Sequence, residues 1–282
     1  MILMRKSLLT CLLIMLVFLS FSNLLDSIAE EYTEAGIERS LITFAISRSL
    51  NGVISVAQGT EVALSPAGVG LTFTPGQILD PVNDLIERFS WVVMVSGASL
   101  GIQRLFLEIT SSVAVNFLLS FFILFYIART WGAFESINKQ SVLFTFLNKG
   151  LVLIIFIRFS VPVIALLNEG IYLSYLQPQF DEAQLKLERA SDQIKQINDS
   201  SRDLVKKQDD SLMGQVENWL EQTKQSLDIE KQMNSLKEAV ADMSHQVINL
   251  IVVFVVQTIV FPLVFLWVLV RSAKGVMRGI SI

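Results

Sequence analysis

The feature that most constrains this chain is a long charged segment that lies between two apolar runs. The charged segment covers residues 177–246, and the apolar runs beside it are Gly150–Tyr172 and Val247–Val270. Each run is long enough to cross a lipid bilayer as a helix, for which about 20 apolar residues suffice. We therefore predict an α-helical hairpin that stands outside a membrane and has both ends rooted in it.

Apolar residues recur inside the charged segment at alternating steps of three and four, with charged residues on either side. This heptad pattern is typical of a coiled coil. It fades at the polar run Lys206–Ser211, which predicts a turn between two antiparallel helices. The alternatives are a single solvated helix or a partly disordered loop. The predicted coiled-coil interface contains Leu187, Ile194, Ile197, Leu204, Trp219, Met233, Leu236, Val240 and Met243.

The two ends of the predicted hairpin differ in their helix signals. Pro178 disfavours helical geometry in the residue before it, and Asp181 suits an N-cap, so we expect a new helix to begin near Glu182. The second arm has neither glycine nor proline between Gln215 and Phe261. We expect that arm to continue unbroken into the last apolar run, with a possible kink at Pro262.

Composition also indicates a membrane protein. Of the 282 residues, 52% are hydrophobic and 17% are charged, whereas soluble domains carry about 25% charged residues. One cysteine, Cys11, excludes an intramolecular disulfide, and one histidine, His245, excludes the usual multi-histidine metal centres. We expect no metal and no cofactor.

The N-terminus resembles an export signal. Arg5 and Lys6 precede the apolar run Ser7–Ser22, and Ser27–Ala29 places small residues where a signal peptidase cleaves. Residues 1–29 are therefore either a cleaved signal peptide or an uncleaved signal anchor.

A segment of mixed character follows over residues 30–108. Its first part has the apolar spacing of an amphipathic helix. Two short runs, Thr60–Leu64 and Val69–Thr74, then flank the turn Ser65–Gly68 and predict a small β-hairpin. We expect a small α/β segment outside the membrane.

Asp80 followed by proline is a helix start signal. The helix that it opens carries only about twelve largely apolar residues, Trp91–Ile102, between arginines. This length fits an interfacial or re-entrant helix better than a membrane span.

A third apolar run, Ile109–Ala128, precedes a basic loop over residues 129–149, and the chain ends in a basic tail over residues 271–282. Together with the N-terminus, these hydrophilic segments contain eight basic residues and one acid, whereas residues 26–108 contain four basic residues and ten acids. Because basic loops stay in the cytoplasm, we expect residues 30–108 and 173–246 to be extracytoplasmic. If Phe89–Ile109 spans the membrane, the orientation of everything downstream inverts. The predicted fold class is a mainly α integral membrane protein with three to four transmembrane helices.

Arg158 is the residue that most suggests a site. It lies near the middle of Gly150–Tyr172, where a charge costs several kcal/mol unless it is paired or hydrated. Polar residues in the other spans offer partners, namely Asn116, Gln257 and Thr258. These four residues predict either a polar conduit or ion-coupled site, or a structural arginine that bonds to neighbouring helices or reaches toward the cytoplasmic face.

No catalytic or nucleotide-binding motif occurs in the chain, and the acidic outer segments disfavour nucleic acid. We therefore expect a non-enzymatic scaffold or assembly protein of a bacterial inner membrane, whose hairpin binds partner proteins or self-associates. The alternative is an oligomeric transporter or channel subunit with a polar intramembrane site around Arg158. The sequence identifies no small-molecule substrate.

Overall fold

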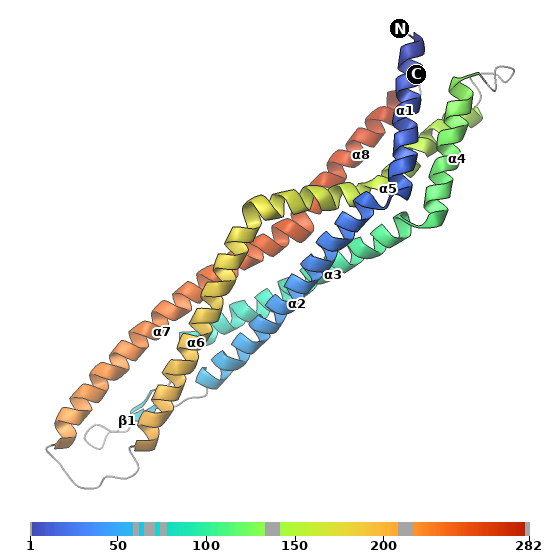
Figure 1. Ribbon diagram of the computed structural model, residues 1–282. Helices are drawn as coiled ribbons and strands as arrows, with labels where there is room; N and C mark the ends of the chain where they lie inside the picture. The colour runs from blue at the N-terminus through green and yellow to red at the C-terminus, as the bar shows by residue number, and fades with distance from the viewer. Residues whose placement is uncertain are drawn as a thin grey trace. The chain divides into compact units, whose positions relative to one another are not determined.

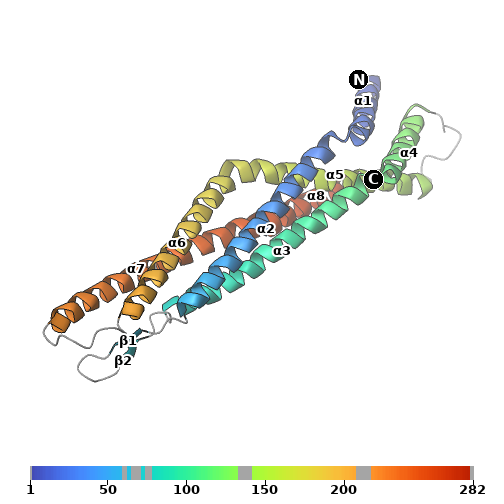
Figure 2. The ribbon, with the colours of Figure 1, turned by 60° about the horizontal axis from the view of Figure 1, so that its bottom comes forward.

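The computed structural model describes residues 2–58, 62–64, 71–73, 78–132, 142–207 and 217–279, and the side chains of residues 3–58, 78–132, 145–196, 234–235 and 237–279. Helices dominate it (Figures 1 and 2). The elements are α1 Ile2–Phe21, α2 Leu24–Gln58, β1 Val62–Leu64, β2 Leu71–Phe73, α3 Asp80–Thr110, α4 Val113–Thr130, α5 Val142–Ile171, α6 Gln177–Lys207, α7 Glu217–Val255 and α8 Phe261–Gly279, with π-helical turns at Tyr172–Leu176 and Val256–Val260.

Six of the described helices are long and apolar enough to cross a membrane: α1, α2, α3, α4, the helix that continues from α5 into α6, and the helix that continues from α7 into α8. Within each, only 11% to 33% of the most apolar 18-residue window is buried. Large apolar side chains such as Phe18, Phe117 and Trp267 are exposed. Exposed apolar surface of this extent is typical of lipid contact, so the chain is consistent with a membrane protein.

The helix that begins at Asp80 is longer than the sequence suggested. We expected a helix that begins at Asp80 and whose apolar part, Trp91–Ile102, is too short to span, but α3 runs for 31 residues and is long and apolar enough to cross a membrane. Arg104, which was expected to limit the apolar stretch, lies inside the helix, with Glu34 at 3.7 Å and Glu108 at 3.6 Å in ion pairs. The charge-based orientation, which treated α3 as non-spanning, loses one of its premises.

The α/β character predicted for residues 30–108 is not supported. Strands β1 and β2 pair antiparallel, with Ala63 opposite Thr72, but each has only three residues. The predicted turn at Ser65–Gly68 lies outside the described residues. Helices α2 and α3 account for most of the segment, because the apolar helical spacing extends further along both than the short strand signals do.

Pro178 does not end the helix that comes from α5, contrary to the expectation of a new helix near Glu182. Helical backbone continues from α5 through the π-helical turn Tyr172–Leu176 into α6. A π-helical turn shifts the hydrogen-bond register of the backbone. The shift lies just before Pro178, a residue that has no N–H to give to a regular helical bond.

The same arrangement occurs in the other long helix. Helix α7 continues through the π-helical turn Val256–Val260 into α8, as the lack of glycine and proline predicted. The turn ends two residues before Pro262, just as the first π-helical turn ends two residues before Pro178.

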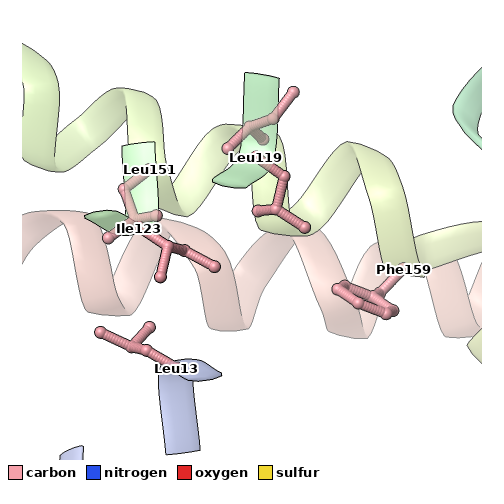
Figure 3. Close-up of a cluster of buried hydrophobic side chains, with 6 residues drawn as sticks. Leu13, Leu119, Ile123, Leu151 and Phe159 are labelled. Carbon is pink, nitrogen blue, oxygen red and sulfur yellow. The ribbon is translucent and has the colours of Figure 1, made fainter. Parts of the chain in front are cut away.

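The described chain forms two compact units. Unit 1 comprises residues 1–38, 96–174 and 256–282, and unit 2 comprises residues 39–95 and 175–255, so α2 and α3 contribute to both. The core of unit 1 joins α1, α4 and α5 (Figure 3) through Leu13, Leu119, Ile123, Leu151, Ile154 and Phe159.

In unit 2, α6 and α7 contact each other, and they run side by side in opposite directions in both views (Figures 1 and 2). We call this pair the helical hairpin. Leu187, Ile194 and Met243 are buried in it, and Val240 is partly buried. The other predicted interface side chains lie outside those described: Ile197, Leu204, Trp219, Met233 and Leu236.

Helix α3 packs against the base of the helical hairpin, which contains Phe180 and Phe254. The ring of Phe89 lies 6.5 Å from the ring of Phe254, which in turn lies 5.9 Å from the ring of Phe180. All three side chains are buried. The hairpin is therefore not free-standing at its base.

Candidate functional site

Arg158 in α5 lies at the centre of the most strongly bonded polar site in the described chain. Its side chain is fully buried. Nη1 donates to Oδ1 of Asp26 at 2.8 Å, and Nη2 donates to Oδ2 of the same carboxylate at 2.5 Å. Such a two-bond pair is the strongest arrangement that a guanidinium and a carboxylate make.

Two neutral residues complete the surroundings of Arg158. Its Nε donates to Oδ1 of Asn116 at 2.7 Å and to Oγ of Ser20 at 3.0 Å, and Nη2 also donates to the carbonyl of Ser20 at 2.9 Å. Ser20 Oγ donates to Asn116 Oδ1 at 2.6 Å. We call Arg158, Asp26, Ser20 and Asn116 the Arg158 network.

Two breaks between helices bring these residues together. Asn23 takes a left-handed conformation with φ of 53°, which asparagine tolerates better than most residues. This break ends α1 just after Ser20 and places Asp26 in the first turn of α2, where the helix dipole favours a carboxylate.

The second break, at residues 111–112, separates α3 from α4. The side chain of Asn116 folds back over it, because Nδ2 donates to the carbonyl of Ser111 at 3.1 Å. This bond fixes the carboxamide with its oxygen toward Arg158.

The Arg158 network satisfies the hydrogen-bond donors and the charge of Arg158 within the protein. All three nitrogens of the guanidinium donate to protein oxygens, and the charge of Asp26 balances that of Arg158. The arrangement therefore joins α1, α2, α4 and α5 and leaves no nitrogen of Arg158 without a protein acceptor.

Gln257 and Thr258 do not bond to Arg158 but belong to a second polar site, which we call the Gln257 cluster. Asn168 Nδ2 donates to the carbonyl of Gln257 at 3.4 Å, and Ser99 Oγ donates to the carbonyl of Thr258 at 3.0 Å. The side chain of Gln257 donates from Nε2 to the hydroxyl of Tyr32 at 3.4 Å. Thus the structure brings only Asn116 of the predicted partners to Arg158.

The backbone explains the Gln257 cluster. In a regular helix the carbonyl of Thr258 would accept from the N–H of residue 262, but residue 262 is proline. The π-helical turn alters the bonding of the neighbouring carbonyls as well. Side chains from α3 and α5 take the place of the missing donors, which is how apolar helices tolerate proline.

One side-chain atom of the Gln257 cluster has no hydrogen-bond partner among the described residues, and the same is true of Ser96, which precedes Ser99 by three residues on α3. The two atoms, Asn168 Oδ1 and Ser96 Oγ, are buried. Both come from the helices that supply Asn168 and Ser99 to the cluster, α5 and α3. Neutral polar atoms tolerate such gaps at a lower cost than a charge does.

Sequence reasoning missed Ser20 and Asp26, because both fall within the segment taken for an export signal. The available signal was Asp26 itself, an acid directly after an apolar run in a chain with an unbalanced intramembrane arginine. Among the described residues, no group of three or more histidines, cysteines or acids is placed to hold a metal ion.

Comparisons of the chain with known protein families, with curated proteins and with solved structures found no match.

Proposed function

We propose that this protein is a membrane-anchored scaffold or assembly protein, with unit 1 as its anchor and the helical hairpin as the part that binds a partner protein or a second copy. The predicted location is the inner membrane of a bacterium, with the hairpin on the outer side. The Arg158 network then has a structural role that keeps the anchor folded.

The observation that carries this proposal is the surplus length of the hairpin. Outside the predicted span Val247–Val270, α6 has 31 residues and α7 has 30, which correspond to roughly 45 Å each. The parts of α2 and α3 in unit 2, residues 39–58 and 80–95, correspond to only about 25 to 30 Å. Helices α2 and α3 are thus too short to cover the hairpin along its whole length.

The described surface of the hairpin also has a suitable binding feature. A hollow of about 770 Å³ lies between α6 and α7 and is lined by polar and acidic side chains. Glu238 and Asp242 supply the negative charge, and His245 lies beside them. The chemistry favours a partner segment that carries basic residues.

The ends of unit 1 support the proposed orientation. Lys6 Nζ donates to the carbonyl of Thr130 at 3.0 Å, and Arg129 donates to Asn148 at 3.2 Å. The basic start of α1, the end of α4 and the start of α5 therefore lie together, as a common cytoplasmic end requires.

Six apolar helices are compatible with four crossings if two crossings are interrupted. Helix α1 with the start of α2 would form one, broken at residues 22–23, and the end of α3 with α4 would form another, broken at residues 111–112. In this arrangement both breaks and the Arg158 network lie within the membrane, and the predicted inner segments stay on one side.

The proposal also assigns residues 1–29 to the mature anchor. Cleavage after Ala29 would remove Ser20 and Asp26, which make four of the five hydrogen bonds that Arg158 donates. The uncleaved signal anchor is therefore favoured over the signal peptide.

An oligomeric transporter or channel subunit is the second candidate. The Arg158 network supports it weakly, because the guanidinium is enclosed and balanced. The unpaired buried atoms of Ser96 and Asn168 are the observation in its favour. If this candidate holds, Asn168→Leu abolishes solute or ion flux in proteoliposomes while the protein remains folded.

The scaffold proposal is tested by photo-crosslinking in intact cells that express the full chain. A photoreactive residue replaces Glu238, which is exposed and lines the hollow. We expect an adduct with a second polypeptide, either another protein or another copy, that mass spectrometry identifies.

The matched control places the same residue at Leu187, which is buried in the hairpin, and should give adducts within the chain only. The proposal fails if Glu238 and the other exposed positions along α6 and α7 yield no intermolecular adduct.

A further inference from the structure

The last part of α8 carries three cations on one side. Arg271, Lys274 and Arg278 are spaced by three and four residues, so they follow one another along a single face of the helix. All three are exposed. We call them the basic stripe.

The basic stripe lacks balancing acids. Helix α8 contains no aspartate or glutamate, and no ion pair joins these three side chains to a carboxylate among the described residues. Like charges at this spacing destabilise a helix. The helix dipole favours a cation in the last turn, as at Arg278, but its effect fades within that turn and does not account for Arg271.

The three side chains line one shallow hollow on the surface of α8. This hollow measures about 380 Å³ and is lined by the basic stripe together with Trp267, Val270 and Gly275. The guanidinium of Arg271 lies 5.5 Å from the centre of the Trp267 ring, which holds it along the helix by a cation–π contact. The site thus offers three positive charges along one face of the helix and no negative charge.

The same face becomes apolar toward the membrane. Leu263 and Trp267 precede Arg271 by eight and four residues, and their side chains are 60% and 61% exposed. At 100° per residue they lie on the face that continues into the basic stripe. An apolar strip that leads through an exposed tryptophan into cations is the pattern of a hydrocarbon–headgroup boundary.

We propose that the basic stripe binds the headgroup of an anionic phospholipid in the surrounding leaflet. The phosphate lies among Arg271, Lys274 and Arg278, and an acyl chain lies along Leu263 and Trp267. The stripe is about 10 Å long, which suits a headgroup with more than one phosphate or two neighbouring lipids. The apolar continuation of the site commits it to a lipid rather than to a soluble phosphate compound.

The test uses the full chain, purified in mild detergent from membranes that contain phosphatidylglycerol and neutral phospholipid in equal amounts, with native mass spectrometry of the lipids that stay bound. We expect selective retention of phosphatidylglycerol. The variant Arg271→Gln/Lys274→Gln/Arg278→Gln should bind it roughly 100-fold more weakly, because each basic residue contributes about a fivefold factor.

The matched control is Lys186→Gln/Arg189→Gln/Lys195→Gln, which removes the same charge from α6 and should retain the lipid as the unmodified chain does. If the triple stripe variant does not remain monodisperse, Lys274→Gln alone should weaken binding about fivefold. Equal retention by the stripe and control variants overturns the proposal, and so does equal loss. Displacement of the bound lipid by inorganic phosphate overturns the assignment to a membrane lipid.

Discussion

The Arg158 network and the Gln257 cluster differ in how completely their polar atoms are hydrogen-bonded. Both place polar groups among apolar helices of unit 1. The hydrogen bonds of Arg158 measure 2.5 to 3.0 Å and engage every nitrogen of the guanidinium. Those of the Gln257 cluster measure 3.0 to 3.4 Å, and Asn168 Oδ1 has no partner among the described residues.

The difference follows from charge. An unpaired charge in an apolar interior costs several kcal/mol or more, so an arginine persists there only with a full set of partners. A neutral hydrogen bond between apolar helices contributes only about 0.6 kcal/mol on average, so an incomplete set is tolerated. The Arg158 network should therefore respond to substitution far more strongly than the Gln257 cluster.

The largest expected effect comes from Asp26→Ala. The substitution leaves a buried guanidinium without its carboxylate, which should destabilise the protein by about 3 to 5 kcal/mol. The measurement is reversible unfolding in detergent with a denaturant. Glu34→Ala is the control, because that carboxylate is 68% exposed in its ion pair with Arg104 and should change stability by less than about 1 kcal/mol.

Removal of both charges tests whether Asp26 and Arg158 act as a pair. Asp26→Leu combined with Arg158→Met should be much more stable than either single variant, because an apolar pair of similar volume often replaces a buried ion pair without loss. Additive losses in this double-mutant cycle would mean that the two residues do not act as a pair.

The next effect in size is that of Arg158→Lys. Lysine keeps the charge but cannot make the two parallel bonds to Asp26 while also reaching Asn116. We expect a loss of about 1.5 to 3 kcal/mol, the range for hydrogen bonds to charged groups. Unfolding as stable as that of the unmodified chain would show that the geometry of the guanidinium is unimportant.

A smaller effect is expected in the Gln257 cluster. Ser99→Ala removes the donor to the carbonyl of Thr258 and should cost about 0.6 kcal/mol, the average for a hydrogen bond between apolar helices. In a Pro262→Ala background, residue 262 regains an N–H for that carbonyl, so the same substitution should cost less. A cost that is unchanged between the two backgrounds would refute the proposed link between Pro262 and Ser99.

The smallest effect is expected for an exposed ion pair. Lys186 Nζ lies 2.7 Å from Glu182 Oε1, and this hydrogen bond, with the charge of Lys186, lowers the pKa of Glu182 and raises that of Lys186. Because the pKa of Glu182 is lowered, its ionised carboxylate stabilises the fold at pH values above the ordinary pKa of 4.5. This contribution to stability is lost as the pH falls through the lowered pKa. Because solvent screens the pair, Glu182→Gln should leave the free energy of unfolding near neutral pH unchanged. A clear loss of stability would contradict the claim that this exposed ion pair contributes far less than the buried pair of Asp26 and Arg158.

The long apolar runs and the local signals for individual helices could be recognised in the sequence. The start of α3 at Asp80 and the continuation of α7 into α8 follow from residue types that act locally. That α3 is apolar enough to span was not predicted, because Arg88 and Arg104 were taken to limit its apolar part, whereas Arg104 lies within the helix beside Glu34 and Glu108. Pro178 misled for a similar reason, since a π-helical turn compensates for it.

The sequence predicted only part of the candidate site. An arginine in an apolar run demands partners, and Asn116 was among those expected. Asp26 was not, because the pattern that indicates an export signal is local and does not reveal that one acid in it pairs with a residue 132 positions away. The left-handed residue Asn23, which turns the chain there, leaves no unambiguous mark in the sequence.

The central claim, that Asp26 and Ser20 hold Arg158 in the mature protein, is tested most directly by the intact mass of the chain purified from native membranes through a C-terminal tag. The account predicts that residues 1–29 are present and that the N-terminal helix survives extraction as part of the same polypeptide. A purified chain that begins at Glu30 and is nevertheless folded and stable would contradict it.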